Sequence, residues 1–186
     1  MIKACVTIVW AWLILCCILP CAAAAEGGVV LVGPGQAPLP IIAQAGQQKL
    51  AESLARYLQQ ISGQKFTVKV ASEAPASGAI VVGAFGDPVA KAMTGDGFII
   101  RSEPDQRRLQ LAGRTAIGTG FAVYAMLQDD LGCQWWSFSE EEVPRLPAPT
   151  VAAGERRYPA LFRYIDLRNN EAQTTRNDFH LKCRSV

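Results

Sequence analysis

The stretch from Ile117 to Leu131 constrains the fold of this chain most, because it predicts a helix with almost no polar side. Its central part, residues 121–127, is FAVYAML. A helix that is apolar nearly all round is buried on several sides, and its small alanines allow other backbones to approach closely. Gly132 follows at the place where a glycine commonly ends a helix. We therefore expect this helix to lie at the centre of the hydrophobic core.

The glycines before this helix raise the alternative of a phosphate site. Gly113 and Gly118 have the spacing of a P-loop, but Thr119 stands where that motif has its lysine, and G-x-G-x-x-G is also absent. An anion held by the helix N-terminus near Arg114 is the functional alternative that is left. We favour the interpretation that these glycines let the helix start close against a sheet, and we expect no cofactor.

A second helix is predicted from Ala45 to Ile61, with apolar residues on one face only. Charged and polar side chains lie between the apolar positions, and Gly63 stands where a C-cap glycine is expected. We expect this face to pack on a flat surface. The apolar positions are Leu50, Leu54, Tyr57, Leu58 and Ile61.

Several short segments have the apolar patterns of strands, and the turn SEPDQR joins the last two as a hairpin. Asp87-Pro88 predicts a short helical turn that reaches Met93. Because strands and helices interleave, we predict an α/β fold of the α+β sandwich type. It would have a mixed sheet containing antiparallel strands, with helices packed on it, and would not be a complete TIM barrel. The predicted strands are Gly28–Gly33, Phe66–Val70, Ala79–Gly83, Gly97–Arg101 and Arg108–Ala112.

The first 25 residues have the pattern of a secretory signal peptide. Lys3 precedes an apolar run from Ala4 to Leu19, and an A-x-A site follows at residues 22–25. A membrane anchor is the alternative, but about 16 apolar residues is short of the roughly 20 that span a bilayer. A lipid anchor on Cys21 is a further alternative. We predict a secreted or periplasmic protein with no membrane association after cleavage.

The mature part has few cysteines and little net charge. Four of the six cysteines lie in the predicted signal peptide, which leaves Cys133 and Cys183 and excludes a disulfide-scaffolded mini-protein. Without Lys3, 17 basic residues face 16 acidic ones, a formal balance of +1. Nucleic-acid binding depends on clustered lysine and arginine, so we expect no nucleic-acid partner.

The sequence predicts neither catalytic nor metal-binding residues. The acidic runs Asp129-Asp130 and Glu140–Glu142 are typical of solvated charge, whereas a glycosidase needs two carboxylates facing each other across a bond. His180, the only histidine, and Cys183 supply two ligands where zinc needs at least three. We expect Cys133 to be a small buried apolar residue.

Trp135 and Trp136, with Phe138, form the one aromatic cluster. Tryptophan faces are platforms for sugar rings, so both tryptophans are candidate substrate-binding residues. The alternative is that one fills the core while the other covers a domain junction, since large aromatic residues are common in cores and interfaces alike.

The segment from the glycine turn to Tyr164 resembles a known family. It combines the glycine turn, AVYAMLQDDLGCQWW, Val143-Pro144 and Tyr158-Pro-Ala-Leu-Phe-Arg-Tyr164. It is similar to the N-terminal domain of secreted alpha-glucuronidase-like glycoside hydrolases, including the DUF4838 group, a domain type similar to domain 2 of beta-hexosaminidases. The resemblance covers about residues 28–166 and is most specific over 113–164.

The resemblance implies a non-catalytic domain that packs against a catalytic TIM barrel, which supplies the acid and base carboxylates. We therefore predict a signal peptide over 1–25, this α/β domain over 26–153, and a linker with the truncated start of a barrel over 154–186. The predicted function is that of a non-catalytic domain of a polysaccharide-degrading hydrolase, whose partner is the barrel and whose candidate ligand is an oligosaccharide. The alternative is a free-standing carbohydrate-binding or interaction module that uses Trp135 and Trp136.

Overall fold

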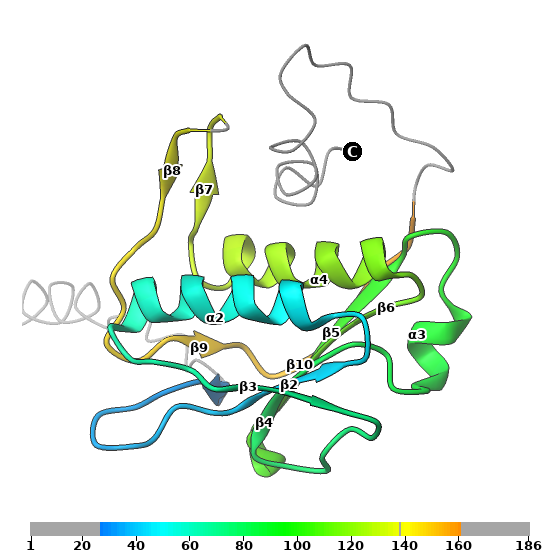
Figure 1. The fold of residues 1–186 in the computed structure, drawn as a ribbon, viewed down its shortest axis with the longest axis horizontal. Coiled ribbons are helices and arrows are strands. Elements are labelled where there is room, and N and C mark those ends of the chain that lie inside the picture. Colours follow the sequence, from blue (N-terminus) through cyan, green and yellow to red (C-terminus); the bar gives the residue numbers. More distant parts are fainter. Residues whose placement is uncertain (1–26, 138, 161–186) are drawn as a thin grey trace, which may run out of the picture.

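The computed structural model describes residues 27–137 and 139–160. Its main element is a six-stranded mixed sheet in the order β10-β5-β6-β4-β2-β3 (Figure 1). The pairs from β6 to β3 are parallel, whereas β5 pairs antiparallel with both β6 and β10. This confirms the predicted fold class, and the described strands form no closed barrel. The strands are β2 (Ile41–Gln44), β3 (Val68–Ala71), β4 (Ala79–Val82), β5 (Phe98–Glu103), β6 (Arg108–Gly113) and β10 (Gly154–Tyr158).

Two long helices lie side by side on one face of this sheet (Figure 1). They are α2 (Gln48–Ser62), which contacts β2 and β3, and α4 (Ala116–Asp129), which contacts β5 and β6. The short helix α3 (Pro88–Ala92) packs against Ile99 and Ala112, which alternate with the residues that face α4 and so belong to the opposite face. The turn between β5 and β6 contains the 3₁₀ helix η1 (Pro104–Gln106). Both long helices, the α3 turn and the hairpin were predicted.

The principal core lies between the sheet and the two long helices. Every residue from Ala122 to Leu127 of α4 is buried, which confirms that the apolar helix is central. Helix α2 buries one face, as predicted, and Gly63 ends it in the left-handed conformation. It begins at Gln48 and not at Ala45, because Gly46 has a φ of +86° and forms a turn. The buried face of α2 consists of Ala51, Leu54, Tyr57, Leu58 and Ile61.

The glycines before α4 allow close packing of the helix on the sheet. A Cβ atom added at Gly113 would lie only 2.2 Å from the backbone carbon of Gly118. The Thr119 hydroxyl donates to the Thr115 carbonyl and accepts from the backbone N–H of Gly113, while the Thr115 side chain caps the Gly118 N–H. The close approach of Gly113 to the backbone of Gly118 confirms the packing interpretation of these glycines.

The N-terminal part of the domain differs from the prediction. From the predicted strand 28–33, only Val29–Val30 form a strand, β1, which pairs with β9 (Thr150–Val151) in a separate two-stranded sheet. The main sheet uses β2, which was not predicted. Its apolar run, Ile41 to Ala43, is too short to show a period, and its strand conformation depends on parallel partners on both sides.

The C-terminal edge of the sheet lies in a segment that the sequence assigned to the linker. Residues 154–158 form β10, which pairs with β5 along its whole length. The sheet therefore extends beyond residue 153. The predicted signal peptide and residues 161–186 lie outside the described part of the chain. Among the residues that are described, no helix has the length and apolar character needed to cross a membrane.

Candidate functional site

A two-stranded antiparallel ribbon stands out from the helical layer (Figure 1). It consists of β7 (Gln134–Trp135) and β8 (Glu141–Glu142), and a further bond runs from the Trp136 N–H to the Glu140 carbonyl at 3.0 Å. Gly132, with a φ of +76°, lets the chain turn from the end of α4 into this ribbon. The ribbon thus carries the tryptophan pair that the sequence predicted as substrate-binding.

The two tryptophans have different environments. Trp135 is 8% exposed and makes edge-to-face contacts with Tyr57 and Tyr124, at ring-centroid distances of 5.9 and 5.5 Å. Trp136 is 68% exposed. Successive side chains of a strand point to opposite faces, so burial of Trp135 directs Trp136 outward. Trp135 therefore has a packing role, and Trp136 is the member of the pair whose side chain is exposed.

A chain of hydrogen bonds attaches the ribbon to the core. The indole N–H of Trp135 donates to the Tyr57 hydroxyl at 3.3 Å, and that hydroxyl donates to Oε2 of Glu141 at 2.7 Å. Both ribbon strands are therefore bound to the same residue of α2. Because core packing determines the orientation of Trp135, it also determines on which side Trp136 is presented.

Cys133 lies at the base of the ribbon and is fully buried. Burial raises the pKa of its thiol to about 12, and the negative charge of Glu141 adds to the shift. The thiol therefore stays protonated near neutral pH and is a poor nucleophile. This confirms the prediction of a buried apolar cysteine. His180, Cys183 and Phe138 lie outside the described residues, and within 27–137 and 139–160 no group of three potential metal ligands occurs.

The acidic run Asp129-Asp130 is not simply solvated, which corrects the prediction for Asp130. The Asp130 side chain is only 5% exposed and binds Nη2 of Arg156 at 2.5 Å. Burial raises the pKa of this carboxyl, while the hydrogen bond from Arg156 opposes the shift. The ion pair joins the end of α4 to β10. The sequence did not predict it, because Arg156 was assigned to a linker.

The sheet face opposite α2 and α4 carries a polar network that the sequence did not predict. Arg101 binds Asp87 at 2.6 Å and Glu155 at 2.5 Å, and it also donates to Gln110. Burial by itself would raise the pKa of Asp87, but hydrogen bonds from Arg101 and the α3 backbone hold it below its usual value. Alternation of polar and apolar residues in β5 and β6 was the available signal. The network links α3, β5, β6 and β10, which is a structural role.

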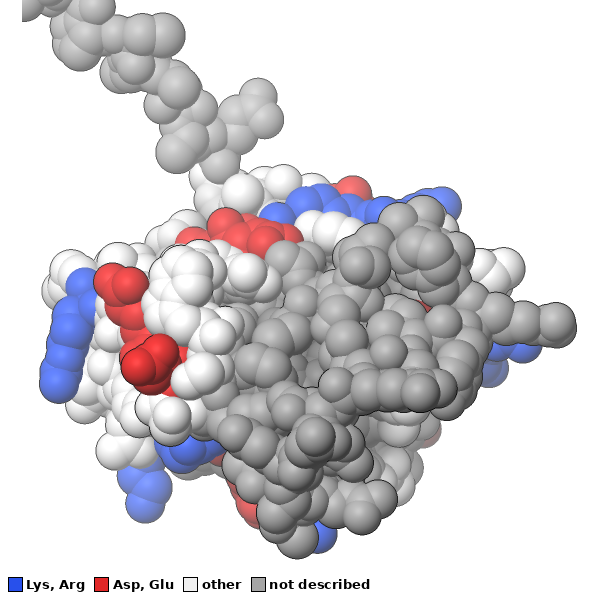
Figure 2. All heavy atoms as spheres, turned by 90° about the horizontal axis from the view of Figure 1, so that it is seen from above, with Lys and Arg blue, Asp and Glu red and all other residues white. Residues whose placement is uncertain are grey.

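Figure 2 shows the molecule from the side of the helices and the ribbon. Lysine, arginine, aspartate and glutamate side chains are interspersed around the visible part of the described surface. No single sign of charge dominates there. Among the described residues, the large apolar side chains with substantial exposure are Val30, Val70, Ile117 and Trp136, of which Trp136 is the most exposed.

No protein-family model matches the sequence, and no curated protein matches it. Solved structures that are similar include a mutant beta-hexosaminidase from Streptomyces plicatus in complex with its product GlcNAc, at 19% identity and a TM-score of 0.49. That match covers 73% of this chain and 24% of the other.

A second mutant of the same enzyme with GlcNAc has 20% identity and a TM-score of 0.46, over 72% of this chain and 26% of that one. The Streptomyces plicatus N-acetyl-beta-hexosaminidase in complex with Thio-NAglucal has 19% identity and a TM-score of 0.44, with the same coverage of 72% and 26%. The chain thus spans about a quarter of the length of these enzymes. Its structural neighbours are beta-hexosaminidases, matched at low identity and over part of their length.

Proposed function

We propose that this chain contributes the non-catalytic N-terminal domain of a secreted alpha-glucuronidase-like glycoside hydrolase, and that the domain packs against a catalytic barrel through its ribbon. The observation that carries the proposal is the 68% exposure of Trp136 on a ribbon attached to the core through Trp135, Tyr57 and Glu141. Tryptophan is enriched among the few residues that carry most of the binding energy of interfaces, so an exposed tryptophan on an ordered element supports an interaction site.

Burial of this side chain would contribute substantially to docking. A tryptophan buries at most about 250 Å², so its exposed part corresponds to roughly 170 Å². At about 25 cal/mol per Å² this is worth about 4 kcal/mol before the cost of association. Tryptophans with such contributions are the usual centres of binding energy in interfaces. The anchored ribbon also lowers the entropy lost on docking, because its position is already determined.

The sequence resemblance supports the choice of partner. Its most specific part, residues 113–164, includes α4, the ribbon and β10. In the family that it resembles, the acid and base carboxylates belong to the barrel. Several carboxylates of the described domain are bound to its own arginines, as in the pairs Asp87–Arg101 and Asp130–Arg156. Their geometry supports a structural role.

A binding experiment tests the docking. The full chain is titrated calorimetrically with the separately produced barrel of an alpha-glucuronidase-like enzyme that lacks its own front domain. We expect saturable binding that Trp136→Ala weakens by about 2–3 kcal/mol. Val70→Ala is the matched control, because Val70 is 50% exposed but lies on the distant edge strand β3. Absence of binding, or equal weakening by both variants, would contradict the proposal.

An activity assay tests the non-catalytic role. We expect no hydrolysis of aryl glycosides or glucuronoxylan fragments by the purified chain. Turnover that disappears in the triple variant Glu140→Gln, Glu141→Gln, Glu142→Gln would overturn this role. Export is tested by sequencing the N-terminus of the protein recovered outside the cytoplasm, where we expect residues 1–25 to be missing.

The second candidate is a free-standing carbohydrate-binding module, which the exposed indole of Trp136 also favours. It predicts saturable oligosaccharide binding with quenching of tryptophan fluorescence, lost in Trp136→Ala while the fold is retained. Trp135 contributes no stacking surface unless it leaves its contacts with Tyr57 and Tyr124. Sugar binding by the isolated chain, without any binding to the barrel, would favour this candidate over the first.

A further inference from the structure

The strand register divides the side chains of the ribbon between two faces. Trp135 and its cross-strand partner Glu141 point toward the core, since both bond to the Tyr57 hydroxyl. Their neighbours in each strand point the other way, because successive side chains of a strand alternate. These neighbours form an outward face of the ribbon. The outward face consists of the pairs Gln134–Glu142 and Trp136–Glu140, the second joined by a backbone bond of 3.0 Å.

Trp136 has two carboxylates beside it on this outward face. Glu140 is directly opposite in the register, where Cβ atoms are about 5 Å apart, and Glu142 is a diagonal neighbour at about 7–8 Å. Both separations are within reach of long side chains. All three side chains are exposed. The indole and the carboxylates can therefore contact the same group of a partner.

The ribbon carries negative charge only. From Gly132 to Pro144 the sequence has three glutamates and no lysine or arginine. Within residues 27–137 and 139–160, no lysine or arginine forms an ion pair with Glu140 or Glu142. Complementary charge steers association and determines the register of an interface. An exposed indole next to these carboxylates therefore favours a positively charged partner.

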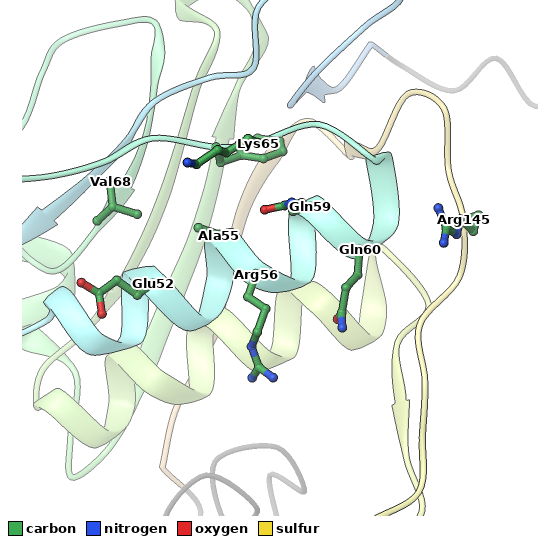
Figure 3. Close-up of a pocket in the computed structure, with 9 residues that line it drawn as sticks. Glu52, Ala55, Arg56, Gln59, Gln60, Lys65, Val68 and Arg145 are labelled. Carbon is green, nitrogen blue, oxygen red and sulfur yellow. The ribbon is translucent and has the colours of Figure 1, made fainter.

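Two arginines on or next to α2 do not neutralise the outward face. The Arg56 guanidinium lies 4.9 Å from the ring centroid of Tyr57, a cation–π contact. Arg145 follows β8 in the sequence but lies beyond the last turn of α2, and its charged end points away from that of Arg56 (Figure 3). The described part of the domain thus leaves the charge of Glu140 and Glu142 to be complemented by another molecule.

The outward face suits a planar cation better than a metal ion. In the described ranges, no three potential metal ligands come together, although three glutamates are consecutive. A guanidinium stacks on an indole ring, and its fork of N–H donors binds carboxylates through paired hydrogen bonds. An ammonium group is a compact and strongly hydrated point charge that lacks this fork. Arginine is therefore the side chain that uses both the ring and the carboxylates.

We propose that the outward face of the ribbon docks on an arginine of the partner, with the guanidinium stacked on Trp136 and bound by Glu140 and Glu142. That the partner is the catalytic barrel rests on the proposed function. The charge and the shape of the group that it presents follow from the ribbon. The other role available to the two glutamates is to keep the ribbon solvated, in which case their charge would not affect binding.

Calorimetric titration with short peptides tests this chemistry without the barrel. The full chain is titrated with acetylated tetra-arginine, tetra-lysine and tetra-citrulline, since citrulline has nearly the shape of arginine but is neutral. We expect saturable binding of tetra-arginine that is at least about threefold weaker at about 200 mM than at about 20 mM NaCl. Tetra-lysine should bind about threefold more weakly and tetra-citrulline at least about tenfold more weakly. Absence of tetra-arginine binding at low salt, or equal binding of tetra-citrulline, would overturn the proposal.

Variants assign the binding to the outward face. Trp136→Ala and the double variant Glu140→Gln, Glu142→Gln should each weaken tetra-arginine binding by about fivefold or more, with melting temperatures within about 2 °C of the parent chain. The matched control is Glu52→Gln, Glu73→Gln, which removes the same charge from exposed positions outside the ribbon. It should change the affinity by less than about twofold. Equal weakening by the two double variants would show a general effect of net charge and refute the assigned face.

The arginine contact and the docking on a barrel can fail separately. If the barrel binds with an affinity that neither salt nor the variant Glu140→Gln, Glu142→Gln changes, the arginine contact is refuted and the docking stands. If tetra-arginine binds as expected and the barrel does not, the docking on the barrel is refuted and the cation-binding face stands. A dimer of the chain in sedimentation that Trp136→Ala dissociates would assign the face to a second copy and overturn the proposal.

Discussion

The ion pair between Asp130 and Arg156 provides a quantitative test of how the domain is held together. The two charged groups approach to 2.5 Å, with 5% of the Asp130 side chain and 36% of the Arg156 side chain exposed. Opposite charges about 4 Å apart attract by about 4 kcal/mol at an effective dielectric constant of about 20. Solvent reaches Arg156 and screens part of this attraction. We therefore expect Arg156→Ala to lower the free energy of unfolding by about 2–3 kcal/mol.

Arg157→Ala is the matched control, because it removes the neighbouring residue of the same type. The Arg157 side chain is 61% exposed and binds Glu155 at 2.6 Å, so its loss should cost below about 0.5 kcal/mol. Arg156→Met keeps much of the apolar stem and should lose nearly as much stability as the alanine variant. We expect a decrease in melting temperature of about 8–12 °C for Arg156→Ala, together with a lower urea midpoint.

The stability deficit of Arg156→Ala should depend on pH. Burial raises the pKa of Asp130 above its usual range in the folded protein, and removal of Arg156 should raise it further. A carboxyl group whose pKa is higher in the folded than in the unfolded protein stabilises the fold at pH values below the unfolded pKa. This stabilisation is lost as the pH rises through the folded pKa. The deficit should therefore be largest at about pH 8 and shrink toward about pH 4. Equal losses for Arg156→Ala and Arg157→Ala, or a deficit that does not shrink in acid, would refute this reasoning.

Three further predictions concern packing and reactivity. Gly113→Ala would place a Cβ 2.2 Å from backbone atoms of α4 and should cost more than about 3 kcal/mol in urea unfolding. Gly33→Ala, whose nearest neighbour would lie at 3.5 Å, should cost less than about 1 kcal/mol; similar losses would contradict the packing role. Trp135→Ala should cost about 3–5 kcal/mol, and Trp136→Ala should stay within about 0.5 kcal/mol, so a reversed order by thermal unfolding would disprove the assigned orientation. Cys133, with a pKa raised to about 12, should resist a pulse of iodoacetamide at neutral pH until urea is added; peptide mass mapping that finds rapid native labelling would contradict its burial.

Elements that depend on neighbouring residues were predictable from the sequence. Helix α2 has one apolar face and ends before Gly63, the Asp87 side chain caps α3, and the hairpin of β5 and β6 closes over a short turn. Such features depend on periodicity and on the conformations that single residues allow. The unusual apolarity of α4 was also enough to predict its central position.

Strands that depend on distant partners were not predictable in the same way. The apolar run of β2 is short, and β10 is mostly polar, with the sequence GERRY. Each forms a strand because other strands offer a ladder of hydrogen bonds, β10 along β5 and β2 between β3 and β4. Sequence patterns contain the preferences of a segment but not the position of its partner.

The candidate site shows the same division. The sequence by itself determined that Trp135 and Trp136 form an aromatic pair and that alternate residues of a strand face opposite sides. Only the tertiary structure decided which one is buried, because Tyr57 of α2 and Tyr124 of α4 surround Trp135 and so leave Trp136 exposed. It also decided that Asp130 is paired and not solvated, since β10 brings Arg156 to it. In both cases the deciding contacts join residues far apart in the chain, and their distance is a property of the fold.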